Sequence, residues 1–156
     1  MTAVLLSVRP RYANALLAGT KTAEVRRRFP HQPRGTIFYL YSSTPDRAIL
    51  GTVQLDGIDR PTADRVWPQY ADQIEIEEAA LGDYLAASAS AAILRVSKPA
   101  RWQHKVPLEL LRSCLQLEPP QSFRYLTNEH VTTLESLRQG RLMAMPQARK
   151  AAFASA

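Results

Sequence analysis

The sequence has very little cysteine and no long apolar run. Cys114 is the one cysteine in 156 residues, so the chain forms neither an internal disulfide nor a zinc site built from cysteines. No apolar run approaches the roughly 20 residues that cross a bilayer, and the N-terminus lacks the basic and apolar segments of a secretory signal. We therefore expect a cytoplasmic protein without a membrane partner.

Several catalytic and cofactor motifs are also missing. The six glycines are scattered, which excludes a glycine-rich phosphate loop, and no Gly-x-Ser-x-Gly sequence forms a nucleophile elbow. His31, His104 and His130 are too far apart in the sequence to predict a metal site. We expect no required cofactor and no dedicated metal site, although a nuclease could use a divalent metal ion.

The charge that is present is distributed unevenly. The formal net charge is +6, and seven basic residues accompany one acidic residue between positions 9 and 34. Between positions 56 and 83 the acidic residues outnumber the basic ones. A basic face attracts nucleic-acid phosphates, because each neutralised phosphate releases condensed counterions. A solvated surface explains the same charges without a ligand, so composition alone leaves both interpretations open.

Short strand patterns are interleaved with helix patterns along the chain. Pro10 suits the first turn of a helix, Gly19 suits a left-handed C-terminal cap, and Gly51 within a strand predicts a bulge or a tight barrel bend. About five short strands with uneven connections favour a mixed β-barrel surrounded by helices, in the α/β (α+β) class. The predicted strands are 4–8, 20–28, 36–41, 48–55 and 90–96, and the predicted helices are 10–18, 61–70, 76–86, 107–115 and 128–137.

The chain length fits one domain. A chain of 156 residues can bury a sizeable core, and no internal repeat is visible. We assign residues 1–137 to this domain. Residues 138–156 contain basic side chains and no acidic ones, and they form a basic, alanine-rich C-terminal tail.

The turn after the first predicted helix carries the strongest candidate for a ligand site. We expect Lys21 to present an exposed ammonium group that points into a cleft and contacts phosphate. Glu24 and Arg26 share one face of the following strand and can form an ion pair. Lys21 and Glu24 are three residues apart, so only a bulge or the turn itself brings them together. A surface ion pair of small energetic value explains Glu24 and Arg26 without a function.

Other candidate side chains offer guanidinium groups, aromatic rings and hydroxyl groups. Arginines bind phosphate through two parallel hydrogen bonds, and aromatic rings stack on bases. Core packing or a solvated strand edge explains several of these residues without a ligand. The candidates for ligand binding are Arg9, Tyr12, Lys21, Thr22, Arg26, Arg28, Tyr41, Ser42, Ser43, Arg124 and Tyr125, and the candidates for catalysis are Lys21 and Glu24.

Residues 7–28 resemble the signature of the ASCH family. The most specific part of this signature is Ala18-Gly19-x-Lys21-Thr22, followed by Arg26. Tyr41-Ser42-Ser43 and Ile49-x-Gly51 fit the pattern that comes next in the family. Residues 119–126 resemble the closing motif of one branch of the family, described as predicted transcriptional regulators.

The resemblance implies a PUA-like β-barrel with a cleft beside the first helix and the second strand. Members of the family are expected to bind RNA or modified nucleosides. Some resemble amidohydrolases that act on acetylated cytidine, and others are ribonucleases that act on single-stranded RNA. In the amidohydrolases, a threonine nucleophile follows three residues after the lysine that matches Lys21. Glu24 occupies that position here, so the resemblance implies a broken catalytic triad.

Three functions are compatible with these observations. The first is an RNA- or nucleotide-binding protein that holds its ligand in a basic cleft and has a regulatory output. The second is a ribonuclease in which Lys21 stabilises phosphate charge and Glu24 acts as the general base, with or without a metal ion. The third is a domain that binds a partner through its acidic helices. The sequence favours the first function and leaves open whether the protein is an enzyme.

Overall fold

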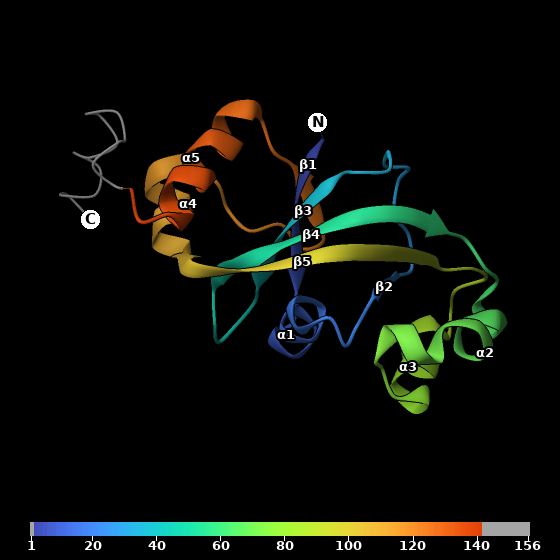
Figure 1. The fold of residues 1–156 in the computed structure, drawn as a ribbon. Helices are drawn as coiled ribbons and strands as arrows, with labels where there is room; N and C mark the ends of the chain where they lie inside the picture. The colour runs from blue at the N-terminus through green and yellow to red at the C-terminus, as the bar shows by residue number, and fades with distance from the viewer. Residues whose placement is uncertain (1, 142–156) are drawn as a thin grey trace.

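Six strands form one sheet in the computed structural model, which describes residues 2–141 (Figure 1). Residues 142–156, most of the predicted tail, lie outside the described residues. The strands are β1 (Ala3–Val8), β2 (Ala23–Arg26), β3 (Ile37–Ser42), β4 (Ala48–Asp59), β5 (Ala92–Pro107) and β6 (Phe123–Tyr125). The helices are α1 (Pro10–Ala18), α2 (Ala63–Ile74), α3 (Glu78–Leu85), α4 (Leu108–Leu115) and α5 (Asn128–Arg138).

The sheet is mixed and curled, with the strand order β2-β5-β4-β3-β1-β6. β1 pairs in parallel with β3, and the other neighbouring strands are antiparallel. The pairing of the long strands β4 and β5 shifts register three times. Gly51 lies at one of these shifts, where the backbone of β5 comes so close that a Cβ atom would stand 2.2 Å from Ala100 O. These bulges bend β4 and β5 and curl the sheet into a half-barrel.

The predicted α+β class and barrel-like sheet are confirmed, with six strands instead of about five. α1 begins at Pro10 and ends at Gly19, whose φ of 82° is the expected left-handed cap. The second strand is shorter than predicted, because residues 19–22 form the turn from α1 into β2. The predicted cap at Asn128 is wrong by one residue, since Thr127 Oγ1 accepts the hydrogen bond from the His130 backbone N–H. No helix between residues 2 and 141 has the length and apolar character needed to cross a bilayer.

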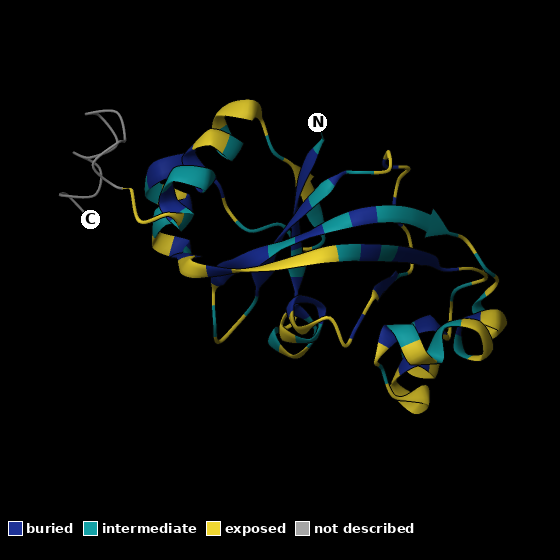
Figure 2. Ribbon diagram, in the orientation of Figure 1, coloured by how far each residue is buried: buried dark blue, intermediate teal, exposed yellow. Residues whose placement is uncertain are grey.

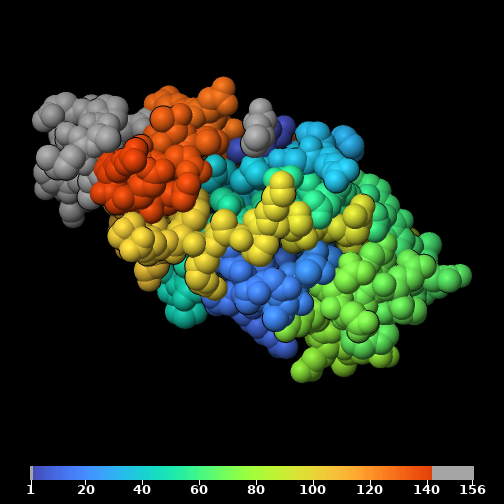
Figure 3. Space-filling view, in the orientation of Figure 1, coloured from blue at the N-terminus to red at the C-terminus, as the bar shows by residue number. Residues whose placement is uncertain are grey.

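Apolar side chains pack into three buried clusters. Alternate residues of β1 face opposite sides of the sheet, so Leu6 packs with α1 whereas Leu5 packs with α4 and α5. The third cluster joins α2 and α3 to β2 through Val25, Val66 and Leu81. Figure 2 shows that the outer faces of α2 and α3 are exposed, and Figure 3 shows the two helices as a lobe beside α1.

Side chains, rather than backbone pairing, connect the two edges of the sheet. β2 and β6 are the edge strands, and no ladder joins them in residues 2–141. Arg26 on β2 donates hydrogen bonds to Ser7 O on β1 at 2.8 Å and to Ser122 Oγ, next to β6, at 3.3 Å. The half-barrel therefore keeps an open seam between β2 on one side and β1 and β6 on the other.

Candidate functional site

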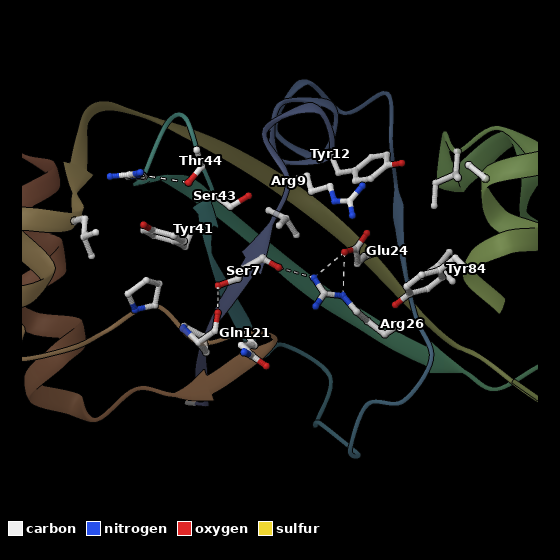
Figure 4. Close-up of a pocket in the computed structure, with 18 of the residues that line it drawn as sticks. Ser7, Arg9, Tyr12, Glu24, Arg26, Tyr41, Ser43, Thr44, Tyr84 and Gln121 are labelled. Carbon is white, nitrogen blue, oxygen red and sulfur yellow. Dashed lines mark hydrogen bonds and ion pairs between the residues drawn. The ribbon is translucent and has the colours of Figure 1, made fainter. Parts of the chain in front are cut away.

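A cleft of about 970 Å³ lies along the open seam (Figure 4). Strands β1, β2 and β3, helices α1, α3 and α4, and the segment that precedes β6 all contribute to its walls. This volume is at the upper end of the range of small-ligand pockets, so the cleft can hold one or a few nucleotides but not a duplex. Six of the predicted site residues line it, namely Arg9, Tyr12, Glu24, Arg26, Tyr41 and Ser43.

The other predicted site residues lie outside this cleft. Ser42 is buried on β3, and its hydroxyl donates to Asp46 Oδ2 at 2.7 Å. Thr22 is exposed on the turn before β2. Arg28, Arg124 and Tyr125 do not line the cleft, and Arg124 and Tyr125 face opposite sides of β6 because they are adjacent on a strand.

The prediction that Lys21 exposes its ammonium group in the cleft is wrong. Lys21 is 1% exposed, and its Nζ atom donates a hydrogen bond to Ile74 O at the C-terminal end of α2. The last carbonyls of a helix have no intrahelical donor and carry partial negative charge, so a cation is stabilised there. Nζ also lies 4.8 Å from the centre of the Tyr12 ring. Burial lowers the pKa of Lys21 below 10.5, and the negative charge of Glu24 opposes this shift.

Glu24 connects the buried lysine to the wall of the cleft. Lys21 Nζ lies 3.4 Å from Glu24 Oε1. The turn before β2 brings the two residues together, which is one of the two ways predicted from the sequence. Glu24 Oε2 accepts hydrogen bonds from Arg26 Nε at 3.0 Å and Nη2 at 2.8 Å. The predicted pair of Glu24 and Arg26 is therefore present, but it is largely buried rather than a weak pair on the surface.

The cleft contains arginines whose charge is available to a ligand. Arg9 and Arg47 form no ion pair with any residue between 2 and 141. Arg112 pairs with Glu118 at 2.8 Å, but both side chains are more than half exposed, so the pair contributes little stability. A phosphate can replace Glu118 as the partner of Arg112. Four arginines and two acidic residues, Glu24 and Asp83, line the cleft, so its electrostatics favour an anionic ligand.

Aromatic rings lie at both ends of the cleft. Figure 4 shows Tyr12 and Tyr84 around Glu24, with Tyr41 at the opposite end. Tyr84 comes from α3, so the lobe of acidic helices contributes to the cleft. Burial raises the pKa of the Tyr41 hydroxyl, whereas the positive charges of Arg47 and Arg112 oppose this shift. The Tyr41 hydroxyl therefore keeps its proton at neutral pH.

Six polar, charged or aromatic residues of the cleft, among them the acidic Asp83, were not singled out from the sequence. Ser7 and Gln121 lie within the segments that resemble the ASCH family, so the signal was present but was not assigned to them. Arg47 lies in a polar turn and Arg112 lies on a short helix, where a charged side chain is usually solvated. The residues are Ser7, Arg47, Asp83, Tyr84, Arg112 and Gln121.

The described residues contain no preformed group of metal ligands. Between positions 2 and 141, no three histidine, cysteine, aspartate or glutamate side chains lie close enough together to hold a metal ion. Cys114 is buried in the cluster formed with α4 and α5. The polar groups that line the cleft are guanidinium, phenol, hydroxyl, amide and carboxylate groups.

Comparisons with known proteins identify similar sequences and structures. The ASCH domain model matches residues 6–111. A protein of Zymomonas mobilis subsp. mobilis, named ASCH domain-containing ribonuclease, is 30% identical over 135 residues, which are 85% of this chain and 90% of that protein. The crystal structure of ASCH from Zymomonas mobilis has a TM-score of 0.82 at 25% identity, over 86% of this chain and 94% of that one.

A more distant structure shares the fold alone. Human THYN1, in complex with DNA that contains 5-methylcytosine, has a TM-score of 0.56 at 12% identity, over 89% of this chain and 98% of that one. These neighbours confirm the predicted PUA-like ASCH fold. Because the domain model covers more than half of the sequence and the Zymomonas protein matches most of it, the chain belongs to the ASCH domain family.

Proposed function

We propose that this protein binds single-stranded RNA in the seam cleft. The observation that carries the proposal is the presence, in one cleft, of unpaired arginines and aromatic rings, as at Arg9, Arg47, Tyr12 and Tyr84. Single-stranded RNA is recognised by cations that contact its phosphates and by aromatic rings that stack on its unpaired bases. The relatives support a nucleic-acid ligand, since one is named a ribonuclease and another was crystallised with DNA.

The buried residues beneath the cleft have a positioning role in this proposal. Lys21 is closed to solvent and cannot contact a phosphate directly. It fixes Glu24, and Glu24 fixes Arg26, whose guanidinium spans the seam. A fixed guanidinium loses little conformational entropy when a ligand binds, so this network favours binding.

Cleavage of RNA is the second candidate function, and the name of the 30% identical relative favours it. The 2′-oxygen of a ribose would attack the adjacent phosphorus, the bond from phosphorus to the 5′-oxygen would break, and that oxygen would take a proton. The 2′-hydroxyl proton would pass to water. Tyr41, a phenol that is protonated at neutral pH, can supply the proton to the leaving oxygen, and Arg47 can stabilise the phosphate charge. A divalent metal ion would assist if the reaction requires one.

The test is the binding of a fluorescently labelled single-stranded RNA, measured by fluorescence anisotropy at several salt concentrations. The affinity should fall as salt rises, and Arg47→Ala should weaken binding about tenfold and reduce the salt dependence. Arg65→Ala, an exposed arginine on α2, removes the same charge outside the cleft and should have little effect. Electrophoresis of the same RNA, with and without Mg²⁺, shows whether it is cleaved. Unchanged binding by Arg47→Ala would contradict the proposed site.

Three finer predictions from the sequence remain part of the proposal. A free nucleotide as the ligand is tested by its competition with the labelled RNA. Membership of the branch of predicted transcriptional regulators depends on the motif at residues 119–126 and would require an effect of the protein on transcription. The cytoplasmic location is tested by fractionating cells that contain the protein.

A further inference from the structure

A second hollow, of about 410 Å³, lies beside the cleft and contains only positive charge. Arg27, Arg28 and Arg60 line it together with the aromatic residues Phe29 and Phe123, and no acidic residue among positions 2–141 does. Arg28 and Arg60 form no ion pair with any residue between 2 and 141. Arg27 is engaged, because its Nε donates to Tyr84 O at 2.8 Å and its guanidinium lies 4.4 Å from the centre of the Tyr84 ring.

An exposed aromatic ring stands next to this hollow. The Phe29 and Phe123 rings are 4.7 Å apart, and the Tyr125 ring lies 5.8 Å from Phe123 at an angle of 87°. Phe29 is buried, which core packing explains, whereas Tyr125 is 53% exposed. The buried Gln32 side chain donates to the Tyr125 hydroxyl at 2.7 Å and fixes the ring in its exposed position. An oriented, exposed ring beside unpaired cations is typical of a base-stacking site.

The hollow continues the cleft along the same seam. On the β2 side, Arg26 lines the cleft and Arg28, two residues later, lines the hollow. On the opposite side, Gln121 lines the cleft and Phe123 lines the hollow. Two residues of chain span at most roughly 7 Å, so an RNA strand that leaves the cleft enters the hollow directly. The hydrogen bond between Arg26 and Ser122 marks the boundary between the two.

We propose that this hollow and Tyr125 form a second RNA subsite, for the nucleotides that flank those held in the cleft. The phosphates contact Arg28 and Arg60, and a base stacks on Tyr125. This inference rests on the proposed RNA binding in the cleft, and it adds that the protein binds an oligonucleotide rather than a single nucleotide. RNA is favoured over an acidic peptide because the hollow is continuous with the cleft and because an aromatic platform accompanies its charges.

The experiment compares two single-stranded oligouridines, of two and eight nucleotides, with 2′-fluoro groups that remove the attacking hydroxyl. Fluorescence anisotropy gives the dissociation constant of each for the wild type, for Tyr125→Ala and for the double variant Arg28→Ala, Arg60→Ala. Both variants should raise the constant for the longer RNA about tenfold. Tyr125→Ala loses the stacking of one base, which corresponds to about that factor, and the double variant loses two phosphate contacts. The constant for the dinucleotide should change less than twofold. Tyr125→Phe keeps the ring but loses the hydrogen bond from Gln32, so it should retain most of the affinity for the longer RNA.

The possible outcomes separate the two proposals. If the wild type binds neither RNA at low salt, RNA binding itself is wrong. If the wild type binds the longer RNA and both variants bind it equally well, only the second subsite is wrong. An equal loss for both RNAs also overturns the subsite, because the substitutions then act on the cleft. A variant that keeps its RNA affinity but loses binding to polyglutamate would assign the hollow to an acidic protein instead. The substituted side chains are exposed, so far-ultraviolet circular dichroism should remain unchanged.

Discussion

Lys21 Nζ lies 3.4 Å from Glu24 Oε1 in a space closed to solvent, beneath the wall of the seam cleft. The same carboxylate accepts two hydrogen bonds from Arg26, so one acidic side chain compensates two cations. The network fastens α2 to the turn before β2, because Lys21 also binds Ile74 O. Changes to its three members should therefore have unequal effects on the stability of the fold.

Glu24→Gln should destabilise the protein far more than Lys21→Met. The first change leaves two largely buried cations without a negative charge, and breaking such a pair lowers the free energy of unfolding by about 3–5 kcal/mol. The second change leaves Glu24 paired with Arg26 and removes mainly the hydrogen bond to Ile74 O, at a loss of about 1–2 kcal/mol. Urea denaturation measures both values, and equal losses would contradict the shared role of Glu24.

Gly51→Ala should destabilise the pairing of β4 with β5. A Cβ atom at this position would stand 2.2 Å from Ala100 O, a backbone atom that cannot rotate away. The forced backbone shift should lower the free energy of unfolding by about 1–3 kcal/mol. Gly82→Ala on α3 is the matched control, since nothing lies within 4 Å of its added atom. That change should stabilise the helix by about 0.5–1 kcal/mol. Thermal denaturation should show a lower midpoint temperature for Gly51→Ala and a higher one for Gly82→Ala than for the wild type.

Tyr41→Phe should separate RNA binding from RNA cleavage if the protein is a ribonuclease. Burial raises the pKa of Tyr41, so its hydroxyl is protonated at neutral pH and is a weaker acid than that of an exposed tyrosine. It can still donate a proton to the leaving alkoxide, which is a stronger base than a phenolate. Loss of a general acid typically slows a reaction by about 10²–10⁴-fold, whereas the phenylalanine ring still stacks on a base. We expect a slower cleavage rate with a nearly unchanged dissociation constant. Cleavage at the wild-type rate would exclude Tyr41 as the proton donor.

Tyr70 should make the stability of the protein decrease at alkaline pH. Burial and the hydrogen bond to Asp59 raise the pKa of Tyr70 from 10.0 to about 12. The folded state therefore holds this proton more tightly than the unfolded state does, and the resulting stabilisation is complete below pH 10. It is lost as the pH rises from 10 to 12. Urea denaturation at pH 8 and pH 11 should show a smaller decrease for Tyr70→Phe than for the wild type, and equal decreases would contradict the assignment.

Local patterns in the sequence predicted the elements that depend on local physics. Pro10 and Gly19 set the ends of α1 because one fixes φ and the other adopts a left-handed conformation. The bulge at Gly51 was predicted from a glycine within a strand, and the ion pair of Glu24 with Arg26 was predicted from strand alternation. These features require only neighbouring residues, which is why one sequence was enough to find them.

The sequence by itself determined the α+β class, the ASCH resemblance and the clustering of basic residues near the first helix. Only the tertiary structure decided which side chains share the cleft, since Arg47, Tyr84 and Arg112 come from segments far apart in the chain. It also decided that Lys21 is buried, because α2 folds over the turn and presents Ile74 O to the ammonium group. Burial and long-range contact depend on how elements pack, and no local pattern encodes that packing.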